Sequence, residues 1–286
     1  MKEEKAFPKG VVCTSGEGGS VLRVGKGTVA TDTIRYGWDG ERSLSMVMEE
    51  ASRATAFLTV RSGPPERILN VTLAEGAQLS LIVLVSGLSD ARLHQTLSIG
   101  SGGKCRLLNV TLGGKGVQQD VVATVEGEGG ESAVDWIFHV AGEESQKLAV
   151  RNVFRARNGG GQITVKGVAE GKARVGCDGM IEITEGGGGT ATFLKQDILM
   201  LDATAHVDAV PGLQIRTNDV KASHSATVTK VSEEELFYFA SRGIKREEAR
   251  AMYIHGFLKD LLSKIEDAAV REEIEDAMEG RMGHGG

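Results

Sequence analysis

The sequence predicts a mostly β protein followed by a small helical subdomain. Glycine occurs 39 times and proline 4 times in 286 residues. This profile suits many tight turns, where glycine adopts positive φ without steric cost. Aromatic residues make up only 5% of the chain, so the core must be aliphatic. Short runs that alternate apolar and polar residues follow one another from about Val11 to Val231, which indicates strands with one buried face.

Glycine-rich corners separate these expected strands. The alternating runs between them include Gln162–Lys166, Ala173–Cys177 and Met180–Thr184. The five residues Leu69–Leu73 recur 39 positions later as Leu108–Leu112. Many similar short strands with recurring corners favour a β-solenoid over a large sandwich, although the pattern alone leaves both open. The glycine clusters are Gly100–Gly103, Gly113–Gly116, Gly127–Gly130, Gly159–Gly161 and Gly186–Gly189.

The chain changes character at Ser232, so we divide it into a β core at residues 11–231 and a helical subdomain at residues 232–279. Ser232–Glu235 reads as a capping box that starts a helix, and Gly243 is placed to end it. Apolar residues at three- and four-residue spacing predict a second helix at residues 246–266. A short acidic helix is expected at residues 268–278, followed by a disordered tail at 280–286.

Composition excludes several classes of function. The net charge is −6, and no run of basic residues suggests nucleic-acid binding. No apolar run approaches the roughly 18 residues of a membrane helix, and the first ten residues lack the apolar region of a signal peptide. Cys13, Cys105 and Cys177 are odd in number and far apart, as expected for reduced thiols. We therefore expect a soluble cytoplasmic protein with no nucleic-acid or membrane partner.

Several motifs match one known family in the same order. Asp219–Ile244 contains Asp-Val-Lys-Ala-Ser-His, Leu-Phe-Tyr and Ser-Arg-Gly-Ile, and it is preceded by Gly179–Ile183, Asp197–Asp202 and Val210–Ile215. This order resembles the SufB/SufD family of SUF-system iron–sulfur cluster assembly proteins, in a SufD-like or compact archaeal-type form. The resemblance implies a right-handed parallel β-helix, a non-enzymatic role in cluster assembly, and a SufC-like ABC-type ATPase as partner.

Departures from the family pattern bear on the metal chemistry. Ala222 and Gln196 stand where family members carry cysteines, and Ser225 stands at a glutamate position. His224 is the retained ligand position, and the resemblance makes it the metal-ligand candidate for a cluster held transiently at a subunit interface; a structural role is the alternative for a lone histidine. That interface would join a homodimer or a heterodimer with a SufB-like chain. His206, eighteen residues upstream, is a candidate neighbour of His224 on an adjacent coil, although other positions align equally well.

The expected helices carry the partner-binding residues. The resemblance assigns ATPase docking to this surface, for which we select Phe237, Tyr238, Arg242, Tyr253 and Phe257. Core packing between two helices is the alternative role for such aromatics. At least one of three successive aromatics must lie near the surface.

Other readings of the chain stay open. Cys177 and Cys105 are either cluster ligands or small buried hydrophobes, and the basic neighbours of Cys105 fall on the opposite face of an alternating strand. The alternatives in function are a paralogue that binds the ATPase but no cluster, and a β-helix enzyme acting on polysaccharides. The second would need paired carboxylates, and Asp135, Asp178 and Asp197 are scattered along the sequence.

Overall fold

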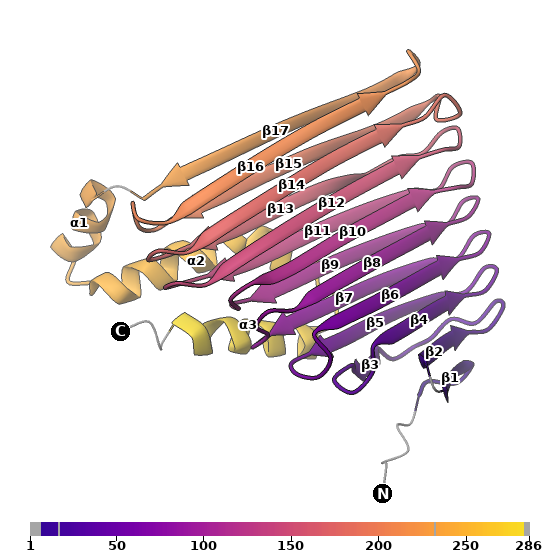
Figure 1. Ribbon diagram of the computed structural model, residues 1–286, viewed down its shortest axis with the longest axis horizontal. Coiled ribbons are helices and arrows are strands. Elements are labelled where there is room, and N and C mark those ends of the chain that lie inside the picture. Colours follow the sequence, from indigo (N-terminus) through magenta and orange to yellow (C-terminus); the bar gives the residue numbers. More distant parts are fainter. Residues whose placement is uncertain (1–6, 17, 232, 283–286) are drawn as a thin grey trace, which may run out of the picture.

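The strands wind into a flattened solenoid with two facing sheets, shown in Figure 1. The computed structural model describes residues 7–16, 18–231 and 233–282, and this part of the chain forms a nine-stranded sheet, an eight-stranded sheet and three helices. From β2 onward, consecutive strands lie in opposite sheets, and neighbours within a sheet pair in parallel. The first two strands pair antiparallel. These features confirm the predicted β-solenoid and exclude the antiparallel sandwich.

Each sheet takes every second strand. The nine-stranded sheet contains β1 (Val11–Gly16), β2 (Gly19–Val24), β4 (Ser43–Met48), β6 (Glu66–Leu73), β8 (Arg92–Ile99), β10 (Val117–Val125), β12 (Ser145–Phe154), β14 (Arg174–Ile183) and β16 (His206–Ile215). The eight-stranded sheet contains β3 (Ile34–Gly37), β5 (Arg53–Val60), β7 (Gln78–Ser86), β9 (Lys104–Leu112), β11 (Glu131–Val140), β13 (Gly160–Ala169), β15 (Thr190–Met200) and β17 (Val220–Lys230).

The coil length explains the sequence repeat. Arg92 pairs with Gln118, so a coil in the middle of the solenoid takes 26 residues. The repeat of Leu69–Leu73 at Leu108–Leu112 spans 39 positions, which is one and a half such coils. The two copies therefore lie in opposite sheets, in β6 and β9. The repeat predicted the solenoid correctly, but it is not the coil period.

The glycine clusters lie at or beside the corners, as predicted. Gly102 has φ 61°, a conformation that favours glycine. Gly127 permits close stacking of two corners, because a Cβ there would lie 2.0 Å from the backbone nitrogen of Ser101. One prediction about strands was wrong. Ala173–Cys177 and Met180–Thr184 largely form a single strand, β14, which runs straight through Gly179.

Two apolar clusters hold the fold together. The first fills the space between the sheets with aliphatic side chains and includes both tryptophans, Trp38 and Trp136, which are 0% exposed. The second lies on the outer face of the eight-stranded sheet, where Leu84, Val110 and Ile137 pack against the helical region. Where the helices pack, that sheet is therefore covered on both faces, which is more common for parallel sheets than an exposed face.

The helical region contains α1 (Glu233–Ser241), α2 (Arg246–Leu262) and α3 (Ala268–Met282). Figure 1 shows α2 and α3 along one side of the solenoid and α1 near the end of β17. Leu258, Leu261 and Ile274 from α2 and α3 belong to the second apolar cluster.

The predicted helix boundaries are partly correct. Gly243 follows α1 with φ 80°, as predicted for a helix end. The second helix ends at Leu262, four residues before the expected Glu266. The third continues to Met282, so residues 280–282, expected in a disordered tail, are helical. Ser232 of the capping box and residues 283–286 of the tail lie outside the described residues. Within the described part of the chain, no helix is long and apolar enough to span a membrane.

Candidate functional site

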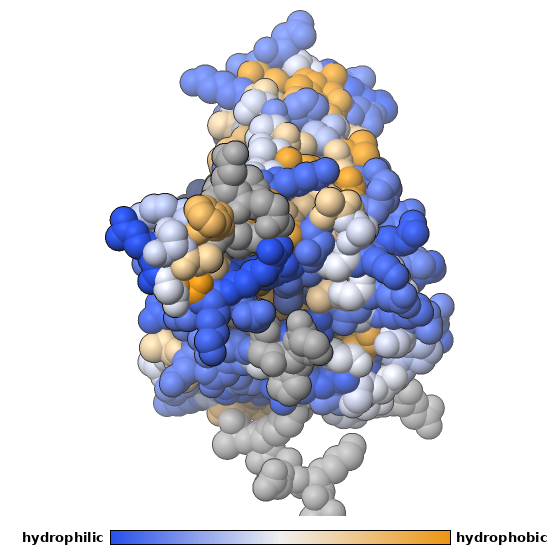
Figure 2. All heavy atoms as spheres, turned by 90° about the vertical axis from the view of Figure 1, so that its left-hand side faces the viewer, coloured by the Kyte–Doolittle hydropathy of each residue, from blue (hydrophilic) through white to orange (hydrophobic). Residues whose placement is uncertain are grey.

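The last coil leaves core-facing side chains uncovered. Strand β16 pairs with β14 and strand β17 pairs with β15, and each is the final strand of its sheet. Ile215 is in register with buried Ile183 and is itself 41% exposed. Val228, in register with buried Ile198, is 43% exposed. Figure 2 shows apolar side chains among hydrophilic ones in its upper part, toward the end where Figure 1 places these strands.

The opposite end of the solenoid differs. There the hairpin partner β1 lies along the outer edge of β2, so the first sheet does not begin with an open parallel strand. The last coil has no such hairpin among the described residues. The two ends are therefore unequal, and the C-terminal end offers both unpaired backbone edges and uncovered apolar side chains.

His224 lies within this open coil. It pairs in register with Leu194, whose side chain is buried, so its position belongs to the core-facing series of β17. No coil covers it, and it is exposed. Ala222, two residues earlier, is half-buried and packs against the core. The predicted neighbour His206 instead starts β16 in the other sheet, where its Nε2 lies 3.3 Å from Asp208 Oδ2.

Gln196 and Cys177, which were separate candidates in the sequence, are in contact inside the solenoid. Gln196 on β15 donates from Nε2 to the backbone oxygen of Cys177 at 3.1 Å and to its Sγ at 3.3 Å. Both side chains are buried, and Gln196 Oε1 has no partner among the described atoms. The alternation of β14 and β15 indicates that each residue faces inward, but their meeting depends on the coil register and could not be read from spacing.

The buried thiols are poor metal ligands in this structure. Burial raises the pKa of Cys105 to about 12. The pKa of Cys177 is also about 12, raised by burial and by the charge of Asp178, with the Gln196 hydrogen bond acting in the opposite direction. A thiolate is the form that binds metal, so both residues are held in the unsuitable state. Lys104 and Arg106 are exposed on the opposite face from Cys105, as predicted.

The described part of a single chain does not assemble a set of metal ligands. Among residues 7–16, 18–231 and 233–282, no group of three or more His, Cys, Asp or Glu side chains is arranged to hold a metal ion. Iron–sulfur clusters need mainly thiolate ligands. A complete cluster site therefore does not fit the described residues of a single chain, and His224 is the family ligand position that lies in the core-facing series at the open end.

The carboxylates considered for polysaccharide chemistry are separate from one another. Asp135 on β11 accepts hydrogen bonds from Lys264 Nζ at 2.9 Å with both oxygens. Asp197 on β15 pairs with Lys195 at 2.6 Å, and Asp178 lies on β14 in the other sheet. The first two are engaged by lysines.

The predicted partner-binding residues divide into two groups. Phe237 is 73% exposed, Tyr238 is 56% exposed, and the guanidinium of Arg242 lies 5.3 Å from the Tyr238 ring centroid. Tyr253 instead packs edge-to-face against Phe239 at 5.6 Å. Phe257 packs beside the second apolar cluster, with Lys166 Nζ 4.9 Å from its ring centroid. The first three face solvent, and the last two contribute to internal packing.

Fold and site together define a class of protein, a parallel β-solenoid with an uncovered last coil and a helical region that presents exposed aromatics. The family profile described as "SUF system FeS cluster assembly, SufBD core domain" matches residues 41–257. This match covers more than half of the chain, so the protein belongs to the SufBD family of iron–sulfur cluster assembly proteins.

Individual relatives agree with this assignment. A SufBD family protein of Mycobacterium tuberculosis is 30% identical over 186 residues, covering 64% of this chain and 22% of the relative. A chloroplastic SufBD family protein of Arabidopsis thaliana is 27% identical over 160 residues, with 54% and 29% covered. SufD of Escherichia coli is 31% identical over 109 residues, with 38% and 26% covered. The alignments thus span less than a third of each of these relatives.

Proposed function

We propose that this protein is a non-enzymatic component of an iron–sulfur cluster assembly complex in the cytoplasm. It docks a SufC-like ABC-type ATPase on the exposed surface of α1, and it pairs through its last coil with a second copy or with a SufB-like chain. The observation that carries the proposal is the uncovered last coil in a chain of the SufBD family. Cys13, Cys105 and Cys177 form no disulfide in the described part of the chain, which fits a reducing compartment.

Docking on α1 is supported by the exposure of its aromatic side chains. Phe237 and Tyr238 are large and solvent-facing, whereas α2 buries Ile254, Leu258 and Leu261 against the solenoid. Exposed aromatics beside an arginine are typical of residues that dominate the free energy of protein–protein binding. They are also costly to leave in water unless a partner covers them.

Pairing through the last coil is supported by the geometry of β16 and β17. A second chain placed against this end would satisfy the free backbone edges and cover Ile215 and Val228. It would also bring its own ligands next to His224. Any cluster handled here is cargo shared between chains, since the buried thiols of this chain cannot reach it as thiolates.

A second candidate is a paralogue that binds the ATPase but never holds a cluster. The substitution of Ala222 and Gln196 for thiols and the burial of Cys105 and Cys177 favour it. The two candidates differ only in the metal content of the assembled complex.

The docking test is capture of a purified SufC-like ATPase by variants of the full chain. Point substitutions are needed because removing α2 and α3 would expose the apolar outer face of the eight-stranded sheet. Combined Phe237→Ala and Tyr238→Ala substitutions should weaken capture at least about tenfold, as expected for central interface aromatics. Met252→Ala, an exposed apolar residue on α2, is the matched control and should retain capture. Equal capture by all variants would place the docking surface elsewhere.

The cluster test is iron and acid-labile sulfide per chain after anaerobic reconstitution. We expect little of either on the isolated protein and more with a cysteine-bearing SufB-like chain. His224→Ala should reduce the content of the pair, whereas His206→Ala, a histidine of the same coil already paired with Asp208, should not. A stable cluster on the isolated chain that persists in His224→Ala would assign the ligands to other residues. No cluster on any pair would favour the second candidate.

A further inference from the structure

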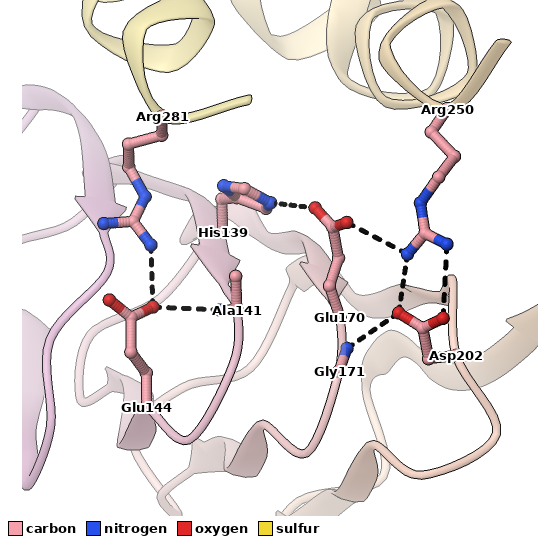
Figure 3. A network of polar contacts seen from close by, with 8 residues as sticks. All are labelled: His139, Ala141, Glu144, Glu170, Gly171, Asp202, Arg250 and Arg281. Atoms are coloured by element: carbon pink, nitrogen blue, oxygen red, sulfur yellow. Dashed lines mark hydrogen bonds and ion pairs between the residues drawn. The ribbon is translucent and has the colours of Figure 1, made fainter. Parts of the chain in front are cut away.

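Arg250 joins the start of α2 to two corners of the solenoid, as Figure 3 shows. Its two terminal nitrogens donate to Asp202 at 3.2 and 2.5 Å, and one of them also donates to Glu170 at 3.0 Å. The side chains of Arg250 and Glu170 are 19% exposed and that of Asp202 is 30% exposed. The planar guanidinium suits such forked contacts, which fix orientation as well as distance.

The network extends into the β-sheet. Glu170 lies at the corner after β13, and its other oxygen is 2.5 Å from Nε2 of His139 on β11. His139 is 3% exposed. Asp202, at the corner after β15, also accepts a hydrogen bond from the backbone nitrogen of Gly171 at 2.7 Å. Hydrogen bonds of His139, Glu170 and Asp202 therefore link the coils of β11, β13 and β15, and Arg250 links α2 to the last two.

The ionisation of the network is consistent with this role. The hydrogen bond from Arg250 holds the pKa of Asp202 below its ordinary range, against the opposing effect of burial. Burial alone would raise the pKa of Glu170, but the hydrogen bonds and charges of His139 and Arg250 outweigh it and lower that pKa. Both carboxylates are therefore charged near neutral pH.

The network lies between the proposed docking surface on α1 and the proposed pairing surface on the last coil. Arg250 lies in the second turn of α2, close after α1 in the chain. Asp202 lies four residues before His206, where edge strand β16 begins. The other ion pairs between the solenoid and the described helical residues lie further along the chain from α1: Lys166–Asp260, Lys264–Asp135, Arg35–Glu273, Arg61–Glu273 and Arg281–Glu144.

We propose that Arg250 is a positioning residue that couples the docking helix α1 to the start of edge strand β16 through Asp202 and Glu170. A partner that pulls or reorients α1 moves the N-terminal turns of α2, and the forked contact passes this displacement to the β15–β16 corner. Docking at α1 and pairing at the last coil then influence each other. This inference rests on the proposed docking function.

The first arm of the test uses the free full-length chain and hydrogen–deuterium exchange. In Arg250→Ala, residues 237–250 and 201–206 should exchange at least about tenfold faster than in the wild type, because a half-buried ion that makes three hydrogen bonds is lost. Arg250→Lys keeps the charge without the fork and should be intermediate. Arg281→Ala, which removes the ion pair to Glu144, should leave both segments unchanged. Exchange of the 201–206 corner within twofold of wild type in Arg250→Ala would overturn the positioning role.

The second arm adds a purified SufC-like ATPase. In the wild type we expect protection of residues 237–242 together with altered exchange at residues 203–215. Arg250→Ala should keep the first response and lose the second, while Arg281→Ala keeps both. No protection of 237–242 in the wild type would contradict the docking proposal. Protection there without a response at 203–215, or an unchanged response in Arg250→Ala, would overturn the coupling alone.

Discussion

The buried thiols should make the folded protein sensitive to alkaline pH. Cys105 and Cys177 have folded-state pKa values of about 12, against an ordinary value of 9.0. Between pH 9 and 12 the unfolded chain releases these two protons and the folded chain does not. The unfolded state then binds fewer protons, so the free energy of unfolding falls as the pH rises.

The size of this effect follows from the shift. At pH 10, one unit above the ordinary thiol pKa, each unfolded thiol is stabilised by about 1.4 kcal/mol through ionisation, and the pair by about 3 kcal/mol. Burial leaves both folded thiols neutral at this pH. The same shift makes the thiolate about a thousandfold scarcer in the folded protein than in an exposed cysteine near pH 8.

Two assays measure these consequences. Urea unfolding of the wild type and of the Cys105→Ala/Cys177→Ala double variant from pH 7.5 to 10 isolates the thiol contribution, because other titrating groups are common to both. The double variant should start less stable and lose about 3 kcal/mol less over this range. Iodoacetamide labelling of the native protein should modify half-buried Cys13 well before the other two. Parallel pH profiles, or equally fast labelling of all three cysteines, would refute the assignment of neutral buried thiols.

Three further outcomes follow from packing and charge. Leu258→Ala should lower the free energy of unfolding by about 2–5 kcal/mol in a urea titration, because this side chain is 0% exposed between α2 and the sheet. Gly127→Ala should lower the free energy of unfolding by about 1–3 kcal/mol or more, because its Cβ would overlap the backbone of the neighbouring corner. Gly40→Ala, with open space around its Cβ, should change the urea midpoint little. The lowered pKa of Asp202 means that its contribution is present at neutral pH and lost as the pH falls below about 4, so the Arg250→Ala variant should show a flatter acid profile than wild type.

The strands and corners were predictable from local pattern, but the choice of a solenoid over a sandwich came from the family resemblance. Alternation reports which side of a strand is buried, and glycine reports where the chain must turn, so the β core and its corners followed from short segments. The three C-terminal helices followed from the change to helical spacing. The 39-residue repeat, in contrast, does not give the coil length. A segment in one sheet can resemble a segment in the other sheet as readily as the segment stacked directly on it.

The contacts that define the site depend on register between distant segments. The Gln196–Cys177 contact requires two strands of opposite sheets to meet across the interior. The packing of α2 and α3 on the solenoid had no local signal either: Leu108–Leu112 is buried at every position in β9, whereas the same five residues at Leu69–Leu73 alternate between buried and exposed in β6. The Arg250 network has no local signature at all.

The core-facing positions are buried inside the solenoid and exposed in the last coil, and this difference indicates how such a protein would take part in cluster assembly. Inside the solenoid, burial keeps Cys105 and Cys177 protonated, so sulfur there strengthens packing and avoids metal. At the last coil, the same core-facing series of positions is left open, and His224 occupies one of them. A residue that would be packed core in any earlier coil is accessible there because no further coil follows. In our proposal the partner chain acts as that missing coil, and cluster ligands are brought together only when the coil is covered. Exchange of partners at this end is then sufficient to assemble or to release the site, without any change in the coils beneath it.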